Sequence, residues 1–131
     1  MIVVDSSAIV YALVGARVNP ELLAVLSDEQ LCAPHLLDFE VASAVRGRVM
    51  SGKLTADRGE RALANYAGLH ILRYEGLGLL GGIWKYRENF TAYDAAYVVL
   101  ANVLKAPLVT SDAKLLEAQR LRVEVQVFQA P

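Results

Sequence analysis

Residues 89–112 read NFTAYDAAYVVLANVLKAPLVTSD, a helical pattern followed by a short apolar strand pattern. The helical part is apolar on nearly every side, which predicts that the helix is buried. It nevertheless carries Asp94, and burial of an unpaired carboxylate is costly in free energy. The strand part, PLVTS, ends immediately before Asp112. The fold must therefore accommodate a buried helix, a buried strand and an acid on or after each.

The composition of the chain predicts one folded domain over residues 1–131. Its 131 residues are 55% hydrophobic, which is enough for a core of its own. Thirteen basic and fourteen acidic residues give a net charge of −1. This balance argues against binding to nucleic acid by bulk charge alone, although a local basic groove remains compatible with it. The single cysteine, Cys32, cannot form an internal disulfide and fits a reducing compartment or a plain buried position.

The apolar run AIVYALVGA at residues 8–16 resembles the central part of a signal peptide. However, no Lys or Arg precedes this run, and Asp5 does. No apolar run reaches the ~18 to 20 residues that are needed to span a bilayer. We therefore expect a cytoplasmic protein that has no membrane partner.

Short apolar runs alternate along the chain with longer helical patterns. Strands are predicted at residues 1–4, 31–34, 69–74, 107–111 and 123–128, and helices at residues 6–14, 20–29, 35–52, 55–69, 77–90, 91–105 and 113–121. Thr55 is expected as an N-cap and Gly52 as a C-cap. The alternation implies a parallel sheet with helices on both faces. In such sheets, binding sites form outside the carboxyl ends of the strands.

Two acids, Asp5 and Asp112, directly follow predicted strands and directly precede helical patterns. Each suits the N-cap of the following helix, where a side-chain oxygen accepts a backbone hydrogen bond. Each also suits a site at the carboxyl edge of the sheet. Both interpretations stay open on the sequence alone.

Asp94 stands three residues after Thr91, a spacing that resembles a capping box, although Glu or Gln is usual at the second position. An acid in the first turn also interacts favourably with the helix dipole. Capping does not explain why the rest of the helix is so apolar. A carboxylate that faces a metal ion, and neither solvent nor the core, accounts for both observations.

Glu40 lies within the helical pattern HLLDFEVASAVRG at residues 35–47. One face of that helix carries Leu37, Val41, Ala44 and Val45. Glu40 projects along the same face, where an acid needs a partner. The partner is either a basic side chain in a salt bridge or a metal ion.

Parallel topology can bring four acids to one end of the sheet: Asp5, Glu40, Asp94 and Asp112. Four neighbouring carboxylates raise one another's pKa unless a cation is present. A divalent ion that prefers oxygen ligands relieves this repulsion, with Mg²⁺ or Mn²⁺ as the natural choice. One ion and two ions are both compatible with four carboxylates.

The remaining metal-binding residue types are His35, His70 and Cys32, and their spacing is not that of zinc ligands. A carboxylate-held Mg²⁺ site suits phosphate chemistry. The ion can lower the pKa of a bound water and neutralise charge that builds up on phosphorus. The four acids therefore indicate chemistry on a phosphate group.

Four stretches resemble the PIN-domain ribonucleases, and within them the VapC-type toxins of toxin–antitoxin systems. They are VVDSSAIV at 3–10, FEVASAV at 39–45, TAYDAAYVVLA at 91–101 and LVTSDAKL at 108–115. The third stretch is the most specific. Together the stretches run from near the first residue to residue 115, so the resemblance covers most of the chain.

The resemblance implies a three-layer α/β/α PIN-like domain with a central parallel sheet of about five strands. It implies an Mg²⁺-dependent endoribonuclease, with Mn²⁺ as the other candidate ion, that cleaves RNA phosphodiester bonds by a metal-activated water. The activity would be that of the toxin in a type II pair. The implied partners are an RNA substrate, a small cognate antitoxin and a second copy in a homodimer.

The resemblance also assigns roles to residues. The catalytic and metal-binding acids would be Asp5, Glu40, Asp94 and Asp112. Ser7 matches a small polar position after the first acid, and Thr110 would support Asp112 by a hydrogen bond. Some relatives carry a further acid after the last aspartate, where this chain has Ala113, Lys114 and Leu115. That departure puts a second metal position in doubt.

Three other interpretations fit the residues less well. GLGLLG at 76–81 matches a dinucleotide-binding pattern, but the acid at the expected distance, Asp94, lies within a helical pattern and does not follow a strand. A phosphoacceptor receiver domain needs an acid after its third strand and a lysine after its fifth, whereas Glu75 is a poor phosphoacceptor and VEVQVFQAP has no lysine. A catalytically silent PIN-like domain that binds RNA or a partner is the third, and the presence of all four acids disfavours it.

Four basic residues are expected to bind the substrate: Arg46, Arg48, Lys85 and Arg87. As phosphate contacts they would position RNA without reading its bases. The alternative for the two arginines on the Glu40 helix is a favourable charge at a helix C-terminus. The alternative for the other pair is a solvated surface.

Three aromatic residues and two apolar runs also have two interpretations each. Tyr11, Trp84 and Tyr86 could stack on RNA bases, or they could belong to the core or an interface. The runs at residues 8–14 and 62–69 could cover a dimer contact or an antitoxin helix. On this basis we expect a homodimer.

Overall fold

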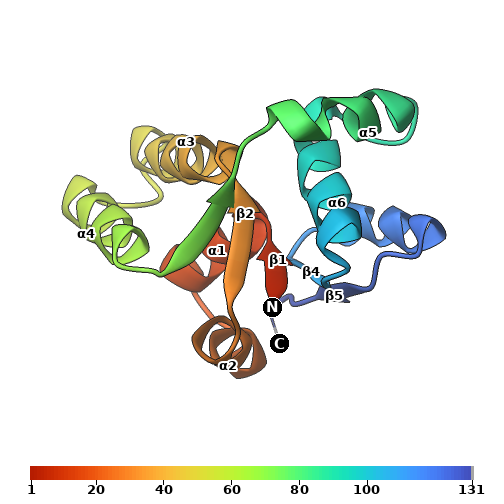
Figure 1. The fold of residues 1–131 in the computed structure, drawn as a ribbon. Coiled ribbons are helices and arrows are strands. Elements are labelled where there is room, and N and C mark those ends of the chain that lie inside the picture. The colour runs from red at the N-terminus through yellow and green to blue at the C-terminus, as the bar shows by residue number, and fades with distance from the viewer. Residues whose placement is uncertain (131) are drawn as a thin grey trace.

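The computed structural model describes residues 1–130, and its centre is a five-stranded sheet (Figure 1). The strands are β1 (Ile2–Val4), β2 (Leu31–Pro34), β3 (Ile71–Tyr74), β4 (Leu108–Thr110) and β5 (Val125–Val127). All four pairings are parallel, in the order β3-β2-β1-β4-β5. The predicted parallel sheet is confirmed. Its central strands are apolar and buried because helices cover both faces.

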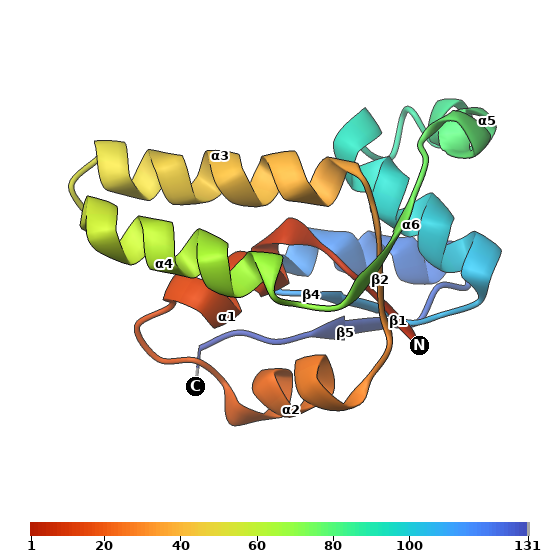
Figure 2. The same ribbon diagram turned by 60° about the vertical axis from the view of Figure 1, so that its left-hand side comes forward.

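Helices follow the strands in regular alternation. They are α1 (Ser6–Val14), α2 (Pro20–Asp28), α3 (Leu36–Met50), α4 (Ala56–Ala67), α5 (Leu80–Lys85) and α6 (Ala92–Leu104), together with the 3₁₀ segments η1 (Leu77–Leu79) and η2 (Ala113–Leu121). α1, α3 and α4 pack against one another on one side of the sheet, and α3 and α4 run side by side (Figure 2). On the other side α6 packs against β1, β2 and β4. The result is three layers.

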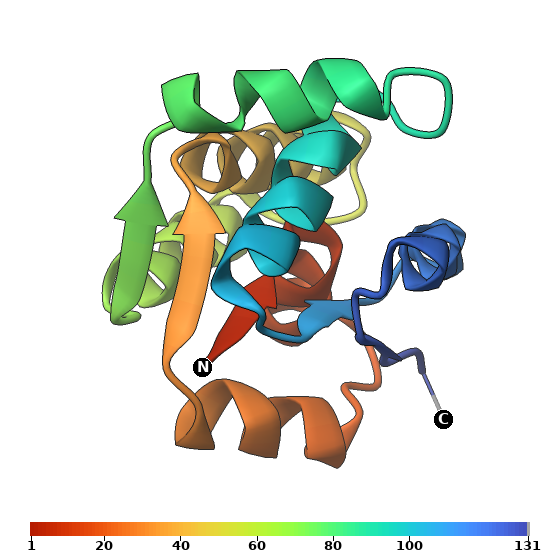
Figure 3. The ribbon, with the colours of Figure 1, turned by 45° about the vertical axis from the view of Figure 1, so that its right-hand side comes forward.

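α2 and α5 lie beyond opposite ends of the strands (Figure 3). α2 begins at Pro20 behind the N-cap Asn19, whose side chain accepts a hydrogen bond from Glu21. α5 packs on α6 through Gly82, where an added Cβ would come within 2.7 Å of a Val99 methyl group. Glycine at this position therefore allows the two helices to approach closely.

The strand order reverses between β1 and β4. After β1, the chain adds β2 and then β3 on one side of β1. It then crosses back and adds β4 and β5 on the other side of β1. Val3 lies opposite Leu108 and Val4 opposite Val109. In open parallel sheets a crevice forms at such a reversal, outside the carboxyl ends of the two strands.

The N-cap predicted for α4 is confirmed, whereas the C-cap of α3 is Ser51, one residue before the predicted Gly52. The Thr55 side chain accepts a hydrogen bond from the backbone of Arg58 at the start of α4. Gly52, just after α3, adopts a φ of +78°, the left-handed conformation that glycine tolerates best.

Two helical segments differ from their predicted form. The predicted helix at residues 77–90 is divided into η1 and the short α5, in a region that contains Gly78 and Gly81, which favour a helix poorly. The predicted helix at residues 113–121 has the expected bounds but the tighter 3₁₀ geometry.

Within residues 1–130, no helix combines the length and the apolar character that crossing a membrane requires.

Candidate active site

The candidate site lies at the carboxyl ends of β1 and β4, where the strand order reverses. Asp5 is the first residue after β1, and its backbone N–H donates to the Val109 carbonyl at 3.1 Å. This bond extends the pairing of β1 with β4 by one residue. Asp5 is thereby set beside Thr110, the last residue of β4.

The carboxylate of Asp5 is buried, with 5% of the residue exposed, and it accepts hydrogen bonds from three residues. Thr110 Oγ1 donates to Oδ2 at 2.6 Å, Ser7 Oγ donates to Oδ1 at 2.8 Å, and the Ala8 backbone N–H donates to Oδ1 at 3.0 Å. Burial raises the pKa of Asp5 to about 6, against the opposing effect of these hydrogen bonds; the Asp112 charge adds a smaller increase. Asp5 is therefore both the N-cap of α1 and a carboxyl group with an unusual affinity for protons.

Thr110 and Ser7, the two predicted supporting residues, connect the ends of the two strands. Thr110 Oγ1 accepts a hydrogen bond from the Asp112 backbone N–H at 3.0 Å while it donates to Asp5. Ser7 Oγ accepts from the Ser111 N–H at 2.9 Å while it donates to Asp5. Each hydroxyl thus bridges the loop after β1 to the loop after β4.

Asp112 also combines capping with a position at the sheet edge. Its Oδ1 accepts from the Lys114 backbone N–H at 3.0 Å, which caps η2. Lys114 Nζ lies 3.7 Å from Oδ2, but the lysine side chain is 82% exposed, so the ion pair contributes little.

Asp94 stands in the first turn of α6, half-buried. Its backbone N–H donates to Thr91 Oγ1 at 3.2 Å, so only one half of the capping box is formed. Within residues 1–130 its carboxylate has no hydrogen-bond or ion-pair partner. Burial raises the pKa of Asp94, and the Asp112 charge raises it further, against Lys114. The rest of α6 is buried from Ala95 to Ala101, as its apolar pattern predicts.

Glu40 lies on α3 beside the buried residues Leu37, Val41 and Val45. Within residues 1–130 no basic side chain pairs with it, so the salt bridge that was one of its two predicted partners is not formed there. Instead the hydroxyl of Tyr97 donates to Glu40 Oε1 at 2.6 Å. Tyr97 is 1% exposed, and burial, followed by the hydrogen bond to Glu40, raises the pKa of its phenol. Tyr97 therefore stays protonated and remains a donor.

Charge interactions relate Asp112 to Asp5 and Asp94, whereas Glu40 is related to Asp5 only through Tyr97. Asp112 acts on the pKa of both Asp5 and Asp94, and the charges of Glu40 and Asp5 both act on Tyr97. In residues 1–130, no three His, Cys, Asp or Glu side chains stand close enough together to enclose an ion as they are placed. The chemistry of the donors nevertheless fits Mg²⁺ or Mn²⁺, because they are carboxylate oxygens. Among the described residues, the exposed Lys114 is the only cationic side chain that pairs with any of them.

The four predicted basic residues have different surroundings. Arg48 lines a groove next to Ser7, whereas Arg46 lines another groove, between α3 and α4. Lys85 Nζ lies 5.4 Å from the centre of the Tyr86 ring, and the Arg87 guanidinium lies 4.5 Å from the centre of the Trp84 ring. All but Arg48 are exposed.

One ionic cluster was not predicted. Arg73 on β3 binds Asp38 on α3 through Nε and Nη2, at 2.9 to 3.0 Å, and Tyr66 on α4 donates to Asp38 Oδ1 at 2.6 Å. The cluster lowers the pKa of Asp38, with the Arg73 hydrogen bonds as the largest cause. The only sequence signal was a second acid two residues before Glu40. Its partners, 28 and 35 positions away, were not recognisable from the sequence.

A PIN domain profile matches residues 2–121 of the chain. The chain is 40% identical over 127 residues to ribonuclease VapC9 of Mycobacterium tuberculosis, covering 97% of this chain and 98% of that protein. It is 39% identical over 127 residues to ribonuclease VapC1 of the same organism, covering 95% and 96% of the two chains.

A solved structure has a similar fold. The crystal structure of PAE2754 from Pyrobaculum aerophilum superposes with a TM-score of 0.70 at 23% identity, covering 88% of this chain and 82% of that one.

Proposed function

This chain belongs to the PIN-domain family, among the VapC ribonucleases, and on that premise we propose that Asp5, Glu40, Asp94 and Asp112 form its acidic centre. The protein is an endoribonuclease, the toxin of a toxin–antitoxin pair. Its reaction is the hydrolysis of RNA phosphodiester bonds.

The observation that carries the proposed centre is the placement of Asp94. A half-buried carboxylate on an otherwise apolar helix has no partner within residues 1–130, while its pKa is raised by burial and by Asp112. Such a group is unfavourable unless a cation or a proton reaches it. Asp5, with its pKa raised to about 6, is in a comparable state.

Divalent-cation dependence is general among PIN-domain nucleases, and Mg²⁺ is the ion we propose, with Mn²⁺ as an alternative. Asp5, Asp94 and Asp112 would hold it, together with Glu40. The bound ion would supply a nucleophilic water at neutral pH and offset negative charge on the phosphate.

The residues of the chain have distinct tasks in this centre. Thr110 and Ser7 hold both oxygens of Asp5 and thereby orient the carboxylate across the β1–β4 crevice. Tyr97 keeps one oxygen of Glu40 occupied, so the other oxygen is the one available to ligand or water. The half-buried Asp94 is shielded from bulk water, which strengthens its interaction with a cation.

We extend the proposal to the assembly. A small antitoxin and an RNA substrate are the partners that the family implies, and residues 1–131 would act as one domain. A homodimer is supported by large apolar side chains that are exposed on η1 and α5, namely Leu77, Leu80 and Trp84. Groups of exposed apolar side chains commonly mark interaction surfaces.

The test is cleavage of total RNA by the purified protein, with Mg²⁺ and with EDTA, followed by mapping of the cut ends. Asp94→Asn keeps the size of the side chain and removes its charge. We expect Mg²⁺-dependent cuts by the wild type and their loss in Asp94→Asn, with an unchanged circular dichroism spectrum.

The alternative is a catalytically silent domain that binds RNA or a partner. That alternative predicts that RNA is bound but remains intact under all conditions, and that Asp94→Asn changes nothing. Either result would refute the proposed acidic centre.

A further inference from the structure

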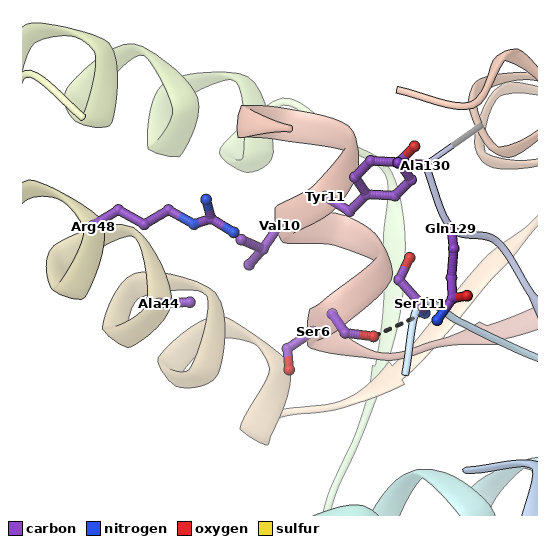
Figure 4. Close-up of a pocket in the computed structure, with 9 residues that line it drawn as sticks. Ser6, Val10, Tyr11, Ala44, Arg48, Ser111, Gln129 and Ala130 are labelled. Atoms are coloured by element: carbon purple, nitrogen blue, oxygen red, sulfur yellow. Dashed lines mark hydrogen bonds between the residues drawn. The ribbon is translucent and has the colours of Figure 1, made fainter. Parts of the chain in front are cut away.

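A groove of about 420 Å³ lies beside the acidic centre, between α1, α3 and the segment that follows β5 (Figure 4). Its floor shares Ser7 and Ser111 with the centre, because Ser7 Oγ binds Asp5 and accepts from the Ser111 N–H. The segment after β5 is fixed against β4 by the Phe128 N–H, which donates to the Thr110 carbonyl at 2.9 Å. A strand of RNA at the acids would therefore meet this groove next.

The charge of the groove is positive. Arg48 is half-buried and extends from α3 toward α1, and within residues 1–130 it forms no ion pair. None of the residues that line the groove is acidic. An unpaired guanidinium in such a place favours a phosphate, which it can bind through two parallel hydrogen bonds.

The groove also has an unused hydroxyl. Ser111 Oγ is buried and has no hydrogen-bond partner in the described part of the chain. Buried polar atoms without a partner are rare and call for an explanation. A ligand that displaced the groups now covering Ser111 Oγ would provide the partner. The Gln129 side chain, on the same side of the groove as Ser111, adds an amide.

The wall of the groove is completed by a rigid aromatic ring. Tyr11 Oη donates to the Arg17 carbonyl at 2.5 Å and accepts from the Asn19 N–H at 2.9 Å. Both contacts lie at the hydroxyl end, so the ring is held in place and lines the groove. Rings of this kind pack against sugars and bases of single-stranded RNA.

We propose that this groove binds one nucleotide of the RNA strand next to the scissile phosphate, with Arg48 on the phosphate and Ser111 on the nucleoside. The proposal rests on the ribonuclease function above and adds a substrate subsite to it. The combination of one unpaired cation, hydroxyl and amide groups and a fixed ring matches the parts of a nucleotide. The volume of the groove lies within the usual range of about 300 to 1,000 Å³ for ligand pockets.

Arg46 provides an internal comparison. It stands two positions before Arg48 on α3, which turns it by roughly 200° about the helix axis. It is exposed and lines the groove between α3 and α4, which also contains Glu60. Both arginines stand on α3 and carry the same charge, but of the two only Arg48 lines the groove that contains Ser7 and Ser111.

The test is the binding of a labelled single-stranded RNA in EDTA, measured by fluorescence anisotropy over a series of KCl concentrations. We expect Arg48→Gln to weaken binding about tenfold and to reduce the slope of log K against log salt by about 0.7, the value for one phosphate contact on a single strand. Arg58→Gln changes an exposed arginine of α4 that lines neither this groove nor the acidic centre, and it should leave both quantities at the wild-type value. Equal effects of the two substitutions, or no effect of either, would overturn the proposal.

Ser111→Ala is the second variant. Removal of an unpaired buried hydroxyl should leave the melting temperature unchanged or raised, while affinity for the RNA falls by about three- to tenfold. A gain in stability with unchanged affinity would mean that the hydroxyl does not contact the nucleotide, and would refute that part of the proposal.

Cleavage assays with Mg²⁺, run in parallel, distinguish a failure of the ribonuclease function from a failure of the nucleotide subsite. If the wild type binds RNA through Arg48 but never cleaves it, the ribonuclease function fails and the subsite remains. If the wild type cleaves and Arg48→Gln cleaves with an unchanged KM, the subsite fails and the function remains. If Arg48→Gln loses affinity for an acidic peptide but not for RNA, the groove is a protein-docking site and the proposal is wrong.

Discussion

The Tyr97 hydroxyl donates a 2.6 Å hydrogen bond to Glu40 Oε1 and thereby joins α6 to α3 across the edge of the sheet. A second tyrosine makes the same contact nearby: the Tyr66 hydroxyl donates to Asp38 Oδ1, also at 2.6 Å. Both tyrosines are buried, and both acids stand on α3. The two contacts differ in that only Glu40 belongs to the proposed acidic centre.

Tyr97→Phe should therefore weaken divalent-cation binding, whereas Tyr66→Phe should not. Loss of the hydroxyl frees Glu40 to adopt other rotamers, and we expect about a three- to tenfold loss of Mn²⁺ affinity by calorimetry, as for other residues that orient metal ligands. Each substitution should lower the unfolding free energy by about 1.5 to 3 kcal/mol, since each removes one hydrogen bond to a charged carboxylate. Equal Mn²⁺ affinity in the two variants would contradict a positioning role for Tyr97.

The stability of the metal-free protein should fall as the pH rises from about 4 to about 6. The folded-state pKa of Asp5 is raised from 3.8 to about 6, so the folded state binds more protons than the unfolded state within this window. The contribution of Asp5 to the unfolding free energy then declines by up to about 3 kcal/mol across the window. Asp5→Asn cannot titrate and serves as the reference.

Melting temperatures of the wild type and Asp5→Asn, measured in EDTA at several pH values, check this expectation. The wild type should lose stability relative to the variant as the pH rises. The opposing effect of Asp38, whose pKa is lowered, is common to both proteins and cancels in the difference. A difference that stays constant with pH would show that the buried carboxyl of Asp5 is not protonated more readily in the folded state.

Addition of Mg²⁺ or Mn²⁺ at neutral pH should raise the melting temperature of the wild type. A ligand that binds only the folded state at 100 times its Kd stabilises that state by about 2.7 kcal/mol. Asp94→Asn should show a much smaller shift, because it lacks the one acid of the centre whose carboxylate has no partner in the described residues. The same shift in both proteins would place the cation elsewhere.

Gly82→Ala should destabilise the protein, and Gly81→Ala should not. A Cβ at Gly82 would lie 2.7 Å from a Val99 methyl group, whereas a Cβ at Gly81 meets nothing within 4 Å. Overpacking of this kind costs about 1 to 3 kcal/mol, and an alanine at the open helical position favours the helix by up to about 1 kcal/mol. Urea denaturation of both variants measures the difference. A similar cost for both would mean that α5 does not press against α6.

The positions of Asp5 and Asp112 could be predicted because each depends on local sequence. A strand, an acid and a helix in succession place the acid at the carboxyl edge of a parallel sheet, and the structure has both acids there. The two interpretations of these acids were not exclusive, since each caps a helical segment and also lies at the carboxyl edge of the sheet. Their binding of a metal stays a prediction.

The contacts that no local pattern contains could not be predicted. The Tyr97 to Glu40 contact joins residues 57 positions apart, and the Arg73 to Asp38 contact joins residues 35 positions apart. The sequence did not predict Tyr97 as a hydrogen-bond donor to Glu40, because a tyrosine in so apolar a helix suggests core packing alone. Likewise, the sequence of residues 113–121 predicted a helix but not the 3₁₀ geometry of η2, which packs on β5 and α6.

Thr110 completes the surroundings of Asp5 although 105 positions separate the two residues. During synthesis the first strand leaves the ribosome early, but its neighbour on one side arrives only when most of the chain has been translated. A nascent chain that lacks β4 has neither Asp112 nor the hydroxyl that orients Asp5. The hydrogen bonds that surround Asp5 can therefore be completed only when translation is nearly finished.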